Sequence, residues 1–466
     1  MLTSLQRLEL APDGLVRELP PSLLALPRLA HVVLENVSCL PSLTEGDAEA
    51  DGMLLQPHPS PHYPRCSRVL VARAHARRPP EFYSLPAEVF RLSALTSLSL
   101  LRLPHVEFLP PALSVLSALR ALKITGASKL AALPESLSEL AALESLELDD
   151  CNALRSLPAS LGRLTALQSM VLRCVALAAM PATMGGLSAL THLSVTKCAA
   201  LTALPDDLGE LGRLKTLTVR SASIATLPNT LSGLARLEEL HIFNCPLLAA
   251  LPDAIGQLPA LKRLYLGYCS ALARLPTSLP RLPALEALDI ESCPLLTHLP
   301  DDFGPLPRLA RLSVHFGALS RLPASLSRLP ALRILDLSSC ASLSALPPDL
   351  AALPALHSLV LLGCSALAEL PAGLARARGL RHLDVRGCPA VGEDTELGVR
   401  ERRVDVKLGP EGNIGAIYRG RRLQQGETRG NEGGEEECVV GGKGGGGVGD
   451  WGGENNGVGG RRDWRS

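Results

Sequence analysis

Leucine residues recur along this chain in one fixed frame. In LESLELDDC, residues 143–151, leucines stand at frame positions 1, 4 and 6, with polar residues at positions 3 and 5. This pattern predicts a short strand with one buried face, because successive side chains of a strand point to opposite sides. The frame occurs fifteen times, beginning at Leu5, Leu29, Leu95, Leu119, Leu143, Leu167, Leu190, Leu214, Leu237, Leu261, Leu285, Leu309, Leu332, Leu356 and Leu380.

A second phrase, Leu-Pro-x-x-Leu-x-x-Leu, separates the predicted strands, as at residues 157–164. Its spacing of three predicts a turn of helix or of 3₁₀ helix, and proline is tolerated in the first turn of a helix. Successive frames begin 24 residues apart, with three intervals of 23 and one of 66. A single repeat cannot bury its own leucines, so the repeats are expected to stack into a solenoid.

The leucine frame, with cysteine at position 9, resembles that of the leucine-rich repeat family. With the Leu-Pro phrase it is similar to plant-type intracellular repeats, such as those of disease-resistance receptors and Ras-group repeat proteins. The resemblance covers about 350 of the 466 residues. It implies an α/β fold: a curved leucine-rich-repeat solenoid of about 15 repeats. Parallel strands would line its concave face, and short helical or 3₁₀ segments its convex side.

Eight of the 12 cysteines occupy frame position 9: Cys151, Cys198, Cys245, Cys269, Cys293, Cys340, Cys364 and Cys388. The resemblance implies that these side chains cap backbone groups of the neighbouring coil. The three 23-residue repeats carry Val175, Ala222 and Gly317 at this position, and their missing residue is expected between it and the next Leu-Pro. A metal or redox site is the alternative, but zinc needs convergent ligands rather than a line of them. We expect no metal and no cofactor.

Charge and hydropathy narrow the class of protein. Lys and Arg number 46, as do Asp and Glu, so the formal net charge is zero and no general attraction to nucleic acid is expected. No apolar run reaches the roughly 18 residues of a membrane span. The first residues, MLTSLQRLEL, lack the apolar core of a signal peptide. We therefore expect a cytoplasmic protein without a membrane span.

Two segments interrupt the repeats. The chain is accordingly divided into N-terminal repeats (1–39), a Pro/His/Arg-rich insertion (40–82), the main repeat array (83–391) and a glycine-rich tail (392–466). The insertion is expected to be flexible. Three interpretations of it stay open: a loop that binds a partner, a solvated loop, or an intron retained in the gene model. The tail is expected to be disordered. The chain opens on a predicted strand, so Leu8 and Leu10 of the first coil are expected to be poorly covered unless sequence precedes them.

Residues 408–422, LGPEGNIGAIYRGRR, resemble the glycine-rich loop of protein kinases. No V-A-I-K, H-R-D or D-F-G motif follows them. The alternative to a binding protein is therefore the sensing half of a truncated leucine-rich-repeat kinase.

Candidate binding residues lie at the outward positions of the predicted strands. The chain has only two Trp, five Tyr and six Phe, and four of these aromatics fall at outward, strand-side positions of repeats 9 to 12, beside two histidines and charged neighbours. Exposed aromatics are enriched at binding surfaces, although they can also simply pack on neighbouring side chains. The predicted partner-binding residues on the concave face are His241, Phe243, Lys262, Tyr265, Tyr268, Asp289, His315 and Phe316.

No motif of a hydrolase, an NTPase or a zinc protease occurs, and the concave histidines lie on separate coils. We therefore predict a non-catalytic scaffold that binds a protein partner through its concave face. The resemblance implies a role in intracellular signalling or defence. The oligomeric state is left open.

Overall fold

A computed structural model describes residues 6–10, 29–35, 55–56, 69–72, 89–90, 92–303, 306–374, 377, 379–391 and 405–407. The chain divides into Met1–Gly412 and Asn413–Ser466, and all the described residues belong to the first unit. The tail beyond residue 407, including the kinase-like segment 408–422, lies outside the described residues, as does most of the insertion.

Each of the fifteen frames forms a strand. The strands are β1 (Arg7–Leu10), β2 (His31–Glu35), β5 (Ser97–Leu101), β6 (Ala121–Thr125), β7 (Ser145–Asp149), β8 (Ser169–Arg173), β9 (His192–Thr196), β10 (Thr216–Arg220), β11 (Glu239–Phe243), β12 (Arg263–Gly267), β13 (Ala287–Glu291), β14 (Arg311–His315), β15 (Ile334–Asp336), β16 (Ser358–Val360) and β17 (His382–Asp384). They pair in parallel and in register, so that frame position 4 of one coil lies beside position 4 of the next, as in Leu240, Leu264 and Leu288.

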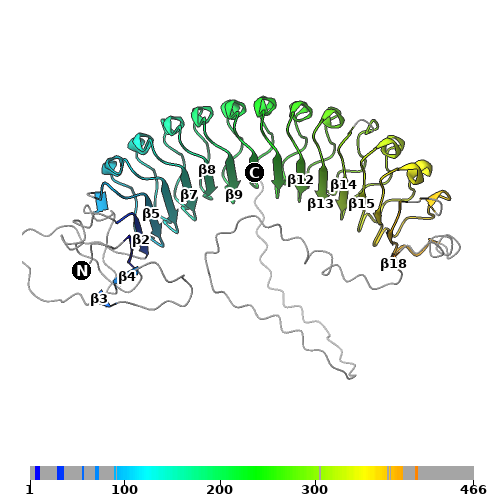
Figure 1. The fold of residues 1–466 in the computed structure, drawn as a ribbon, viewed down its shortest axis with the longest axis horizontal. Coiled ribbons are helices and arrows are strands. Elements are labelled where there is room, and N and C mark those ends of the chain that lie inside the picture. The colour runs from blue at the N-terminus through cyan, green and yellow to red at the C-terminus, as the bar shows by residue number, and fades with distance from the viewer. Residues whose placement is uncertain are drawn as a thin grey trace, which may run out of the picture. The chain divides into compact units, whose positions relative to one another are not determined.

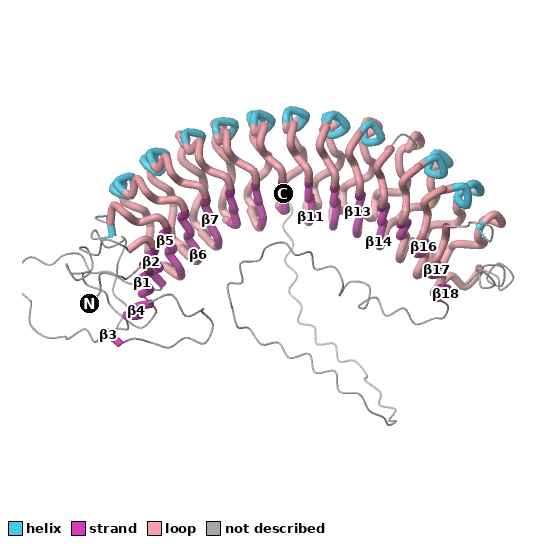
Figure 2. The backbone as a smooth tube through the Cα atoms, viewed as in Figure 1, coloured by secondary structure: helices cyan, strands magenta, loops and turns pink. Residues whose placement is uncertain are grey.

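Short 3₁₀ helices form on the return path of most coils. They are η2 (Pro111–Val115), η3 (Glu135–Glu139), η4 (Leu161–Arg163), η5 (Met184–Gly186), η6 (Asp206–Glu210), η7 (Asn229–Gly233), η8 (Asp253–Gln257), η9 (Leu279–Arg281), η10 (Ala324–Arg328) and η11 (Pro348–Ala352). In the repeat array the strands line the inner side of an arc, and these helices line the outer side (Figures 1 and 2). Leucines from both sides meet between them in one continuous core.

Three further strands lie outside the leucine frame. Inside the insertion, β4 (Val69–Ala72) pairs in parallel with β1, and β3 (Leu55–Gln56) pairs antiparallel with β4. At the other end, β18 (Asp405–Lys407) pairs in parallel with β17. The outer edge of β1 is therefore covered by a strand that the leucine frame does not predict. Likewise, the sheet continues beyond residue 391, where the array was expected to end.

One backbone position shapes the turn after each strand. Frame position 8 has a left-handed conformation in eleven coils, three times in a glycine and eight times in another residue. The 23-residue repeats that begin at Leu167 and Leu214 have no such residue there. Left-handed backbone is costly for residues other than glycine, so its recurrence shows that the turn requires it.

The alignment of these two short repeats needs correction. Cys174, not Val175, takes the place of the inward cysteine: its thiol donates to the carbonyl of Leu148, at frame position 6 of the preceding coil, over 3.8 Å. Ser221, and not Ala222, is the inward residue of the other short repeat, and its hydroxyl donates to the carbonyl of Cys198, at frame position 9 of the preceding coil, over 2.5 Å. The residue deleted from these two repeats is the left-handed one before the inward position; of the three 23-residue repeats, only that of Gly317 keeps it, at Phe316.

Candidate functional site

The parallel register brings the outward side chains of successive coils into columns on the concave face. Frame position 5 aligns His241, Tyr265 and Asp289 on β11, β12 and β13. Frame position 7 aligns Phe243, Gly267, Glu291 and then His315. Neighbouring strands lie about 4.8 Å apart, so each side chain can contact its counterpart on the next coil.

Aromatic rings gather on β11 and β12. The ring of Phe243 packs edge-on against Tyr265, with the ring centroids 6.2 Å apart. His241 lies at the same centroid distance from Tyr265, in a tilted arrangement. The guanidinium of Arg220, at the end of β10, lies 5.4 Å from the centroid of Phe243, within range of a cation–π contact. Arg220 precedes Phe243 in the same outward column, but it is not among the predicted partner-binding residues.

Gly267 gives Tyr265 its position. A Cβ added to Gly267 would lie 2.7 Å from the hydroxyl of Tyr265, so the tyrosine occupies the space of the missing side chain. From there the Tyr265 hydroxyl donates to Glu291 Oε2 over 2.7 Å. Tyr268 donates to the other oxygen, Oε1, over 2.8 Å. The carboxylate of Glu291 thus accepts a hydrogen bond from each of the two tyrosines. These bonds link the coil of β12 to β13 on the concave face.

Tyr268 and Phe316 differ from the expectation that they lie on the strands. Both follow their strand at frame position 8 and have left-handed backbone, with φ of 54° and 50°. Left-handed backbone is unusual for bulky residues. Tyr268 is 50% exposed and Phe316 45% exposed, so both project from the rim of the sheet where the strands end.

Two further apolar side chains lie on the same rim. Leu247 and Leu295, each at frame position 11, are 55% and 54% exposed. Both follow a Cys-Pro pair in the phrase Cys-Pro-Leu-Leu, a repeated signal that sequence analysis did not use. We call Leu247, Tyr268, Leu295 and Phe316 the rim patch; its members come from four consecutive coils.

Histidines and carboxylates flank the aromatic cluster on both sides. His315 Nε2 lies 3.1 Å from Asp336 Oδ2, and the Ser338 hydroxyl donates to Oδ1 of that carboxylate over 2.5 Å. Burial lowers the pKa of His315, but the hydrogen bond and charge of Asp336 outweigh it, so the pKa lies above its ordinary value. Burial lowers the pKa of His241, and the charge of Asp289 only partly opposes this. His241 Nε2 lies 3.2 Å from Glu239 Oε2.

Lys262 lies away from the rim patch. It precedes β12, at the end of the strand opposite to Tyr268, and its Nζ lies 2.7 Å from Glu238 Oε2. The structure therefore brings His241, Phe243, Tyr265 and Asp289 together and places Tyr268 and Phe316 at the adjoining rim. Lys262 sits at the opposite rim.

The cysteines of the frame form a buried row of free thiols, and Cys174 belongs to it. Cys340, Cys364 and Cys388 donate to the position 6 carbonyl of the preceding coil over 3.3, 3.2 and 3.0 Å. Burial raises the pKa of Cys198 and Cys340 to about 11, which disfavours the reactive thiolate.

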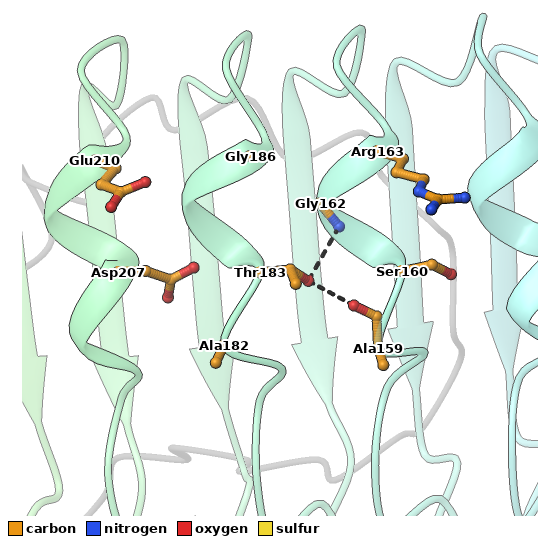
Figure 3. A pocket seen from close by; sticks show the side chains of 9 residues that line it. All are labelled: Ala159, Ser160, Gly162, Arg163, Ala182, Thr183, Gly186, Asp207 and Glu210. Carbon is orange, nitrogen blue, oxygen red and sulfur yellow. Dashed lines mark hydrogen bonds between the residues drawn. The ribbon is translucent and has the colours of Figure 1, made fainter.

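A shallow hollow opens on the outer face between η4, η5 and η6 (Figure 3). There the Thr183 hydroxyl accepts from the N–H of Gly162 over 3.4 Å and donates to the carbonyl of Ala159 over 2.7 Å. Asp207 accepts from the N–H of Gly185 over 2.6 Å. These bonds link neighbouring coils, so the hollow is a product of how the outer turns pack.

Among the described residues, no group of three or more His, Cys, Asp or Glu side chains is arranged to hold a metal ion. The part of the chain that the structure describes also contains no helix long and apolar enough to cross a membrane.

No family model matches the chain, and no curated protein matches it. Solved structures do match. The Drosophila Toll–Spatzle complex, a molecular hub in development and innate immunity, superposes with a TM-score of 0.57 and 20% identity, over 82% of this chain and 46% of that one. The fold is a leucine-rich-repeat solenoid. A leucine-rich-repeat protein of Leptospira interrogans shares 21% identity over 70% of this chain and 93% of its own, with a TM-score of 0.49. The plant peptide hormone receptor RGFR1, in complex with RGF2, shares 19% sequence identity over 88% of this chain and 67% of the receptor chain, with a TM-score of 0.48.

Proposed function

We propose that this solenoid is a non-catalytic recognition scaffold that binds a protein partner through the concave face of β11 to β14. The observation that carries the proposal is the arrangement of Tyr265 over Gly267, packed against Phe243 and bonded to Glu291. Partly exposed aromatics held in one orientation lose little conformational entropy on binding, and such residues dominate protein interfaces.

The arrangement of polar groups favours binding over catalysis. Ser338 and His315 both contact Asp336. The hydroxyl of Ser338 therefore bonds to the carboxylate of Asp336 and not to the imidazole of His315. A hydrolytic triad needs the imidazole between the other two groups. On the resemblance of the repeats to plant-type intracellular ones, we place the role in cytoplasmic signalling or defence.

The test compares proteins that co-purify with the wild-type chain and with the variant Phe243→Ala/Tyr265→Ala. Val171→Ala is the matched control, because Val171 occupies the column of Tyr265 four coils earlier. We expect a partner that wild type and control retain and the double variant loses, with unchanged circular dichroism in all three. A partner list that the double variant leaves unchanged would reject this surface.

A further inference from the structure

The rim patch and the concave face of β13 adjoin each other. Tyr268 joins them, since its backbone lies in the rim while its hydroxyl bonds Glu291 on β13. The rim patch holds four of the seven large hydrophobic side chains that the described residues expose. Such a concentration on four consecutive coils is typical of an interaction surface rather than of scattered apolar residues.

The concave face beside the patch is acidic. Positions 3, 5 and 7 of β13, β14 and the β15 coil present three carboxylates, Asp289, Glu291 and Asp336, against one arginine, Arg311, and one histidine, His315. Asp289 has no hydrogen bond or ion pair with any described residue, although its charge acts on His241 and His315. Glu291 is bonded by two neutral hydroxyls, and the basic side chain beside it in the column is a histidine, His315, on which its charge acts.

Carboxylates elsewhere on the concave face are neutralised. Arg173 NH1 lies 2.9 Å from Asp149 and 3.6 Å from Glu147, and Lys123 Nζ lies 3.3 Å from Glu147. The first acidic patch of the array is thus paired with arginine and lysine, whereas the charges of Asp289 and Glu291 act on histidines, which a basic side chain of a partner can supplement.

We propose that β13 and the rim patch form one docking surface for a segment of the partner protein that carries lysine or arginine next to apolar residues. This inference rests on the proposed function and specifies its partner. Three coil intervals of about 4.8 Å separate Leu247 from Phe316, so an extended segment of about five residues spans the patch. A basic side chain of that segment lies on the ring of Tyr265 and donates to free acceptor positions of Glu291 or Asp289.

The test uses three pools of fluorescent twelve-residue synthetic peptides with the same Leu, Val and Phe content and either Lys/Arg, Asp/Glu or Ser/Gln at the remaining positions. Binding to the full chain is measured by anisotropy at two salt concentrations. We expect the basic pool to bind at least tenfold more tightly than the acidic pool. Asp289→Asn/Glu291→Gln should remove that preference, and Leu247→Ser/Phe316→Ser should weaken the basic and neutral pools alike.

Two matched controls should change neither result: Glu147→Gln, a concave carboxylate with basic partners, and Val175→Ser, an exposed apolar residue outside the patch. Equal binding of the pools, or preference for the acidic one, overturns the inference. Self-association of wild type that Leu247→Ser/Phe316→Ser abolishes would assign the patch to a second copy and also overturn it.

The proposed function can survive that failure. A partner that Phe243→Ala/Tyr265→Ala loses but both docking-surface variants retain would keep the concave site and reject the basic segment. Failure of all pools, together with a partner list unaffected by any variant, would reject both.

Discussion

At the scale of single residues, the candidate site depends on one absent side chain. A Cβ at Gly267 would lie within 3.0 Å of three atoms of Tyr265, all at the distal end of that side chain. The tyrosine can rotate away, so Gly267→Ala should change the free energy of unfolding by less than about 1 kcal/mol. It should nevertheless separate Tyr265 from Glu291 and weaken partner binding.

The measurement for Gly267→Ala is urea denaturation beside partner binding. Gly212→Ala serves as control, because its Cβ would meet nothing closer than 4.0 Å. Binding that stays at the wild-type level would show that the position of Tyr265 is not needed.

The pKa of Tyr268 provides a second test at this scale. It lies above its ordinary value, first because the hydroxyl donates to Glu291, with burial and the charge of Glu291 adding to the effect. Glu291→Gln removes the charge and should lower the pKa of Tyr268 toward its ordinary value. NMR titration of ring-labelled tyrosine, with Tyr268→Phe to assign the signal, measures the change. A pKa that does not move would contradict the hydrogen bond.

Residue types alone could not reveal this site in full. The aromatic enrichment on repeats 9 to 12 was visible in the sequence, and the structure does bring Phe243 and Tyr265 into contact. The left-handed backbone of Tyr268 was not visible, because a bulky aromatic is a poor signal for that conformation. The bonds to Glu291 depend on side-chain rotamers across two coils, which no spacing specifies.

At the scale of elements, glycine is needed in the turns for two different reasons: left-handed backbone in one turn and close approach of a neighbouring coil in another. Gly363 has φ of +73°, and a Cβ there would meet only ordinary contacts, so Gly363→Ala should cost about 1 kcal/mol through backbone strain alone. Gly256 lies in η8, where a Cβ would be 2.3 Å from the carbonyl oxygen of Ser278. Because neighbouring backbone must move, Gly256→Ala should cost about 2–3 kcal/mol.

Urea denaturation of both variants checks this order. Gly212→Ala is again the control and should be neutral or slightly stabilising. If Gly363→Ala proved as harmful as Gly256→Ala, close approach of the outer turns would not be what limits residue size there.

The strands were the most predictable elements. Each leucine frame became a strand, because frame positions 4 and 6 determine which face is buried. The strands β3, β4 and β18 were not predictable, since they add to the ends of the sheet through backbone pairing and carry no leucine frame. The two short repeats were misaligned for a related reason: Cys174 and Ser221 keep the buried inward position while the left-handed residue before them is deleted.

At the scale of the whole repeat array, each coil packs only on its neighbours, so stability should be local. Leu264 and Leu122 are buried at the same frame position, in repeats 10 and 4. Either Leu→Ala substitution should cost about 2–5 kcal/mol through lost burial and a residual cavity. In a solenoid that cost falls on the substituted coil and the coils beside it rather than on the entire chain.

Amide hydrogen exchange shows which repeats each of the two variants destabilises. Leu264→Ala should accelerate amide exchange in repeats 9 to 11 and weaken partner binding, because the concave cluster lies on those coils. Leu122→Ala should accelerate exchange around repeat 4 to a similar degree and leave binding unchanged. Faster exchange along all fifteen repeats in either variant would mean that the array opens as one cooperative unit. Loss of binding in both would then report global stability rather than the site on β11 to β14.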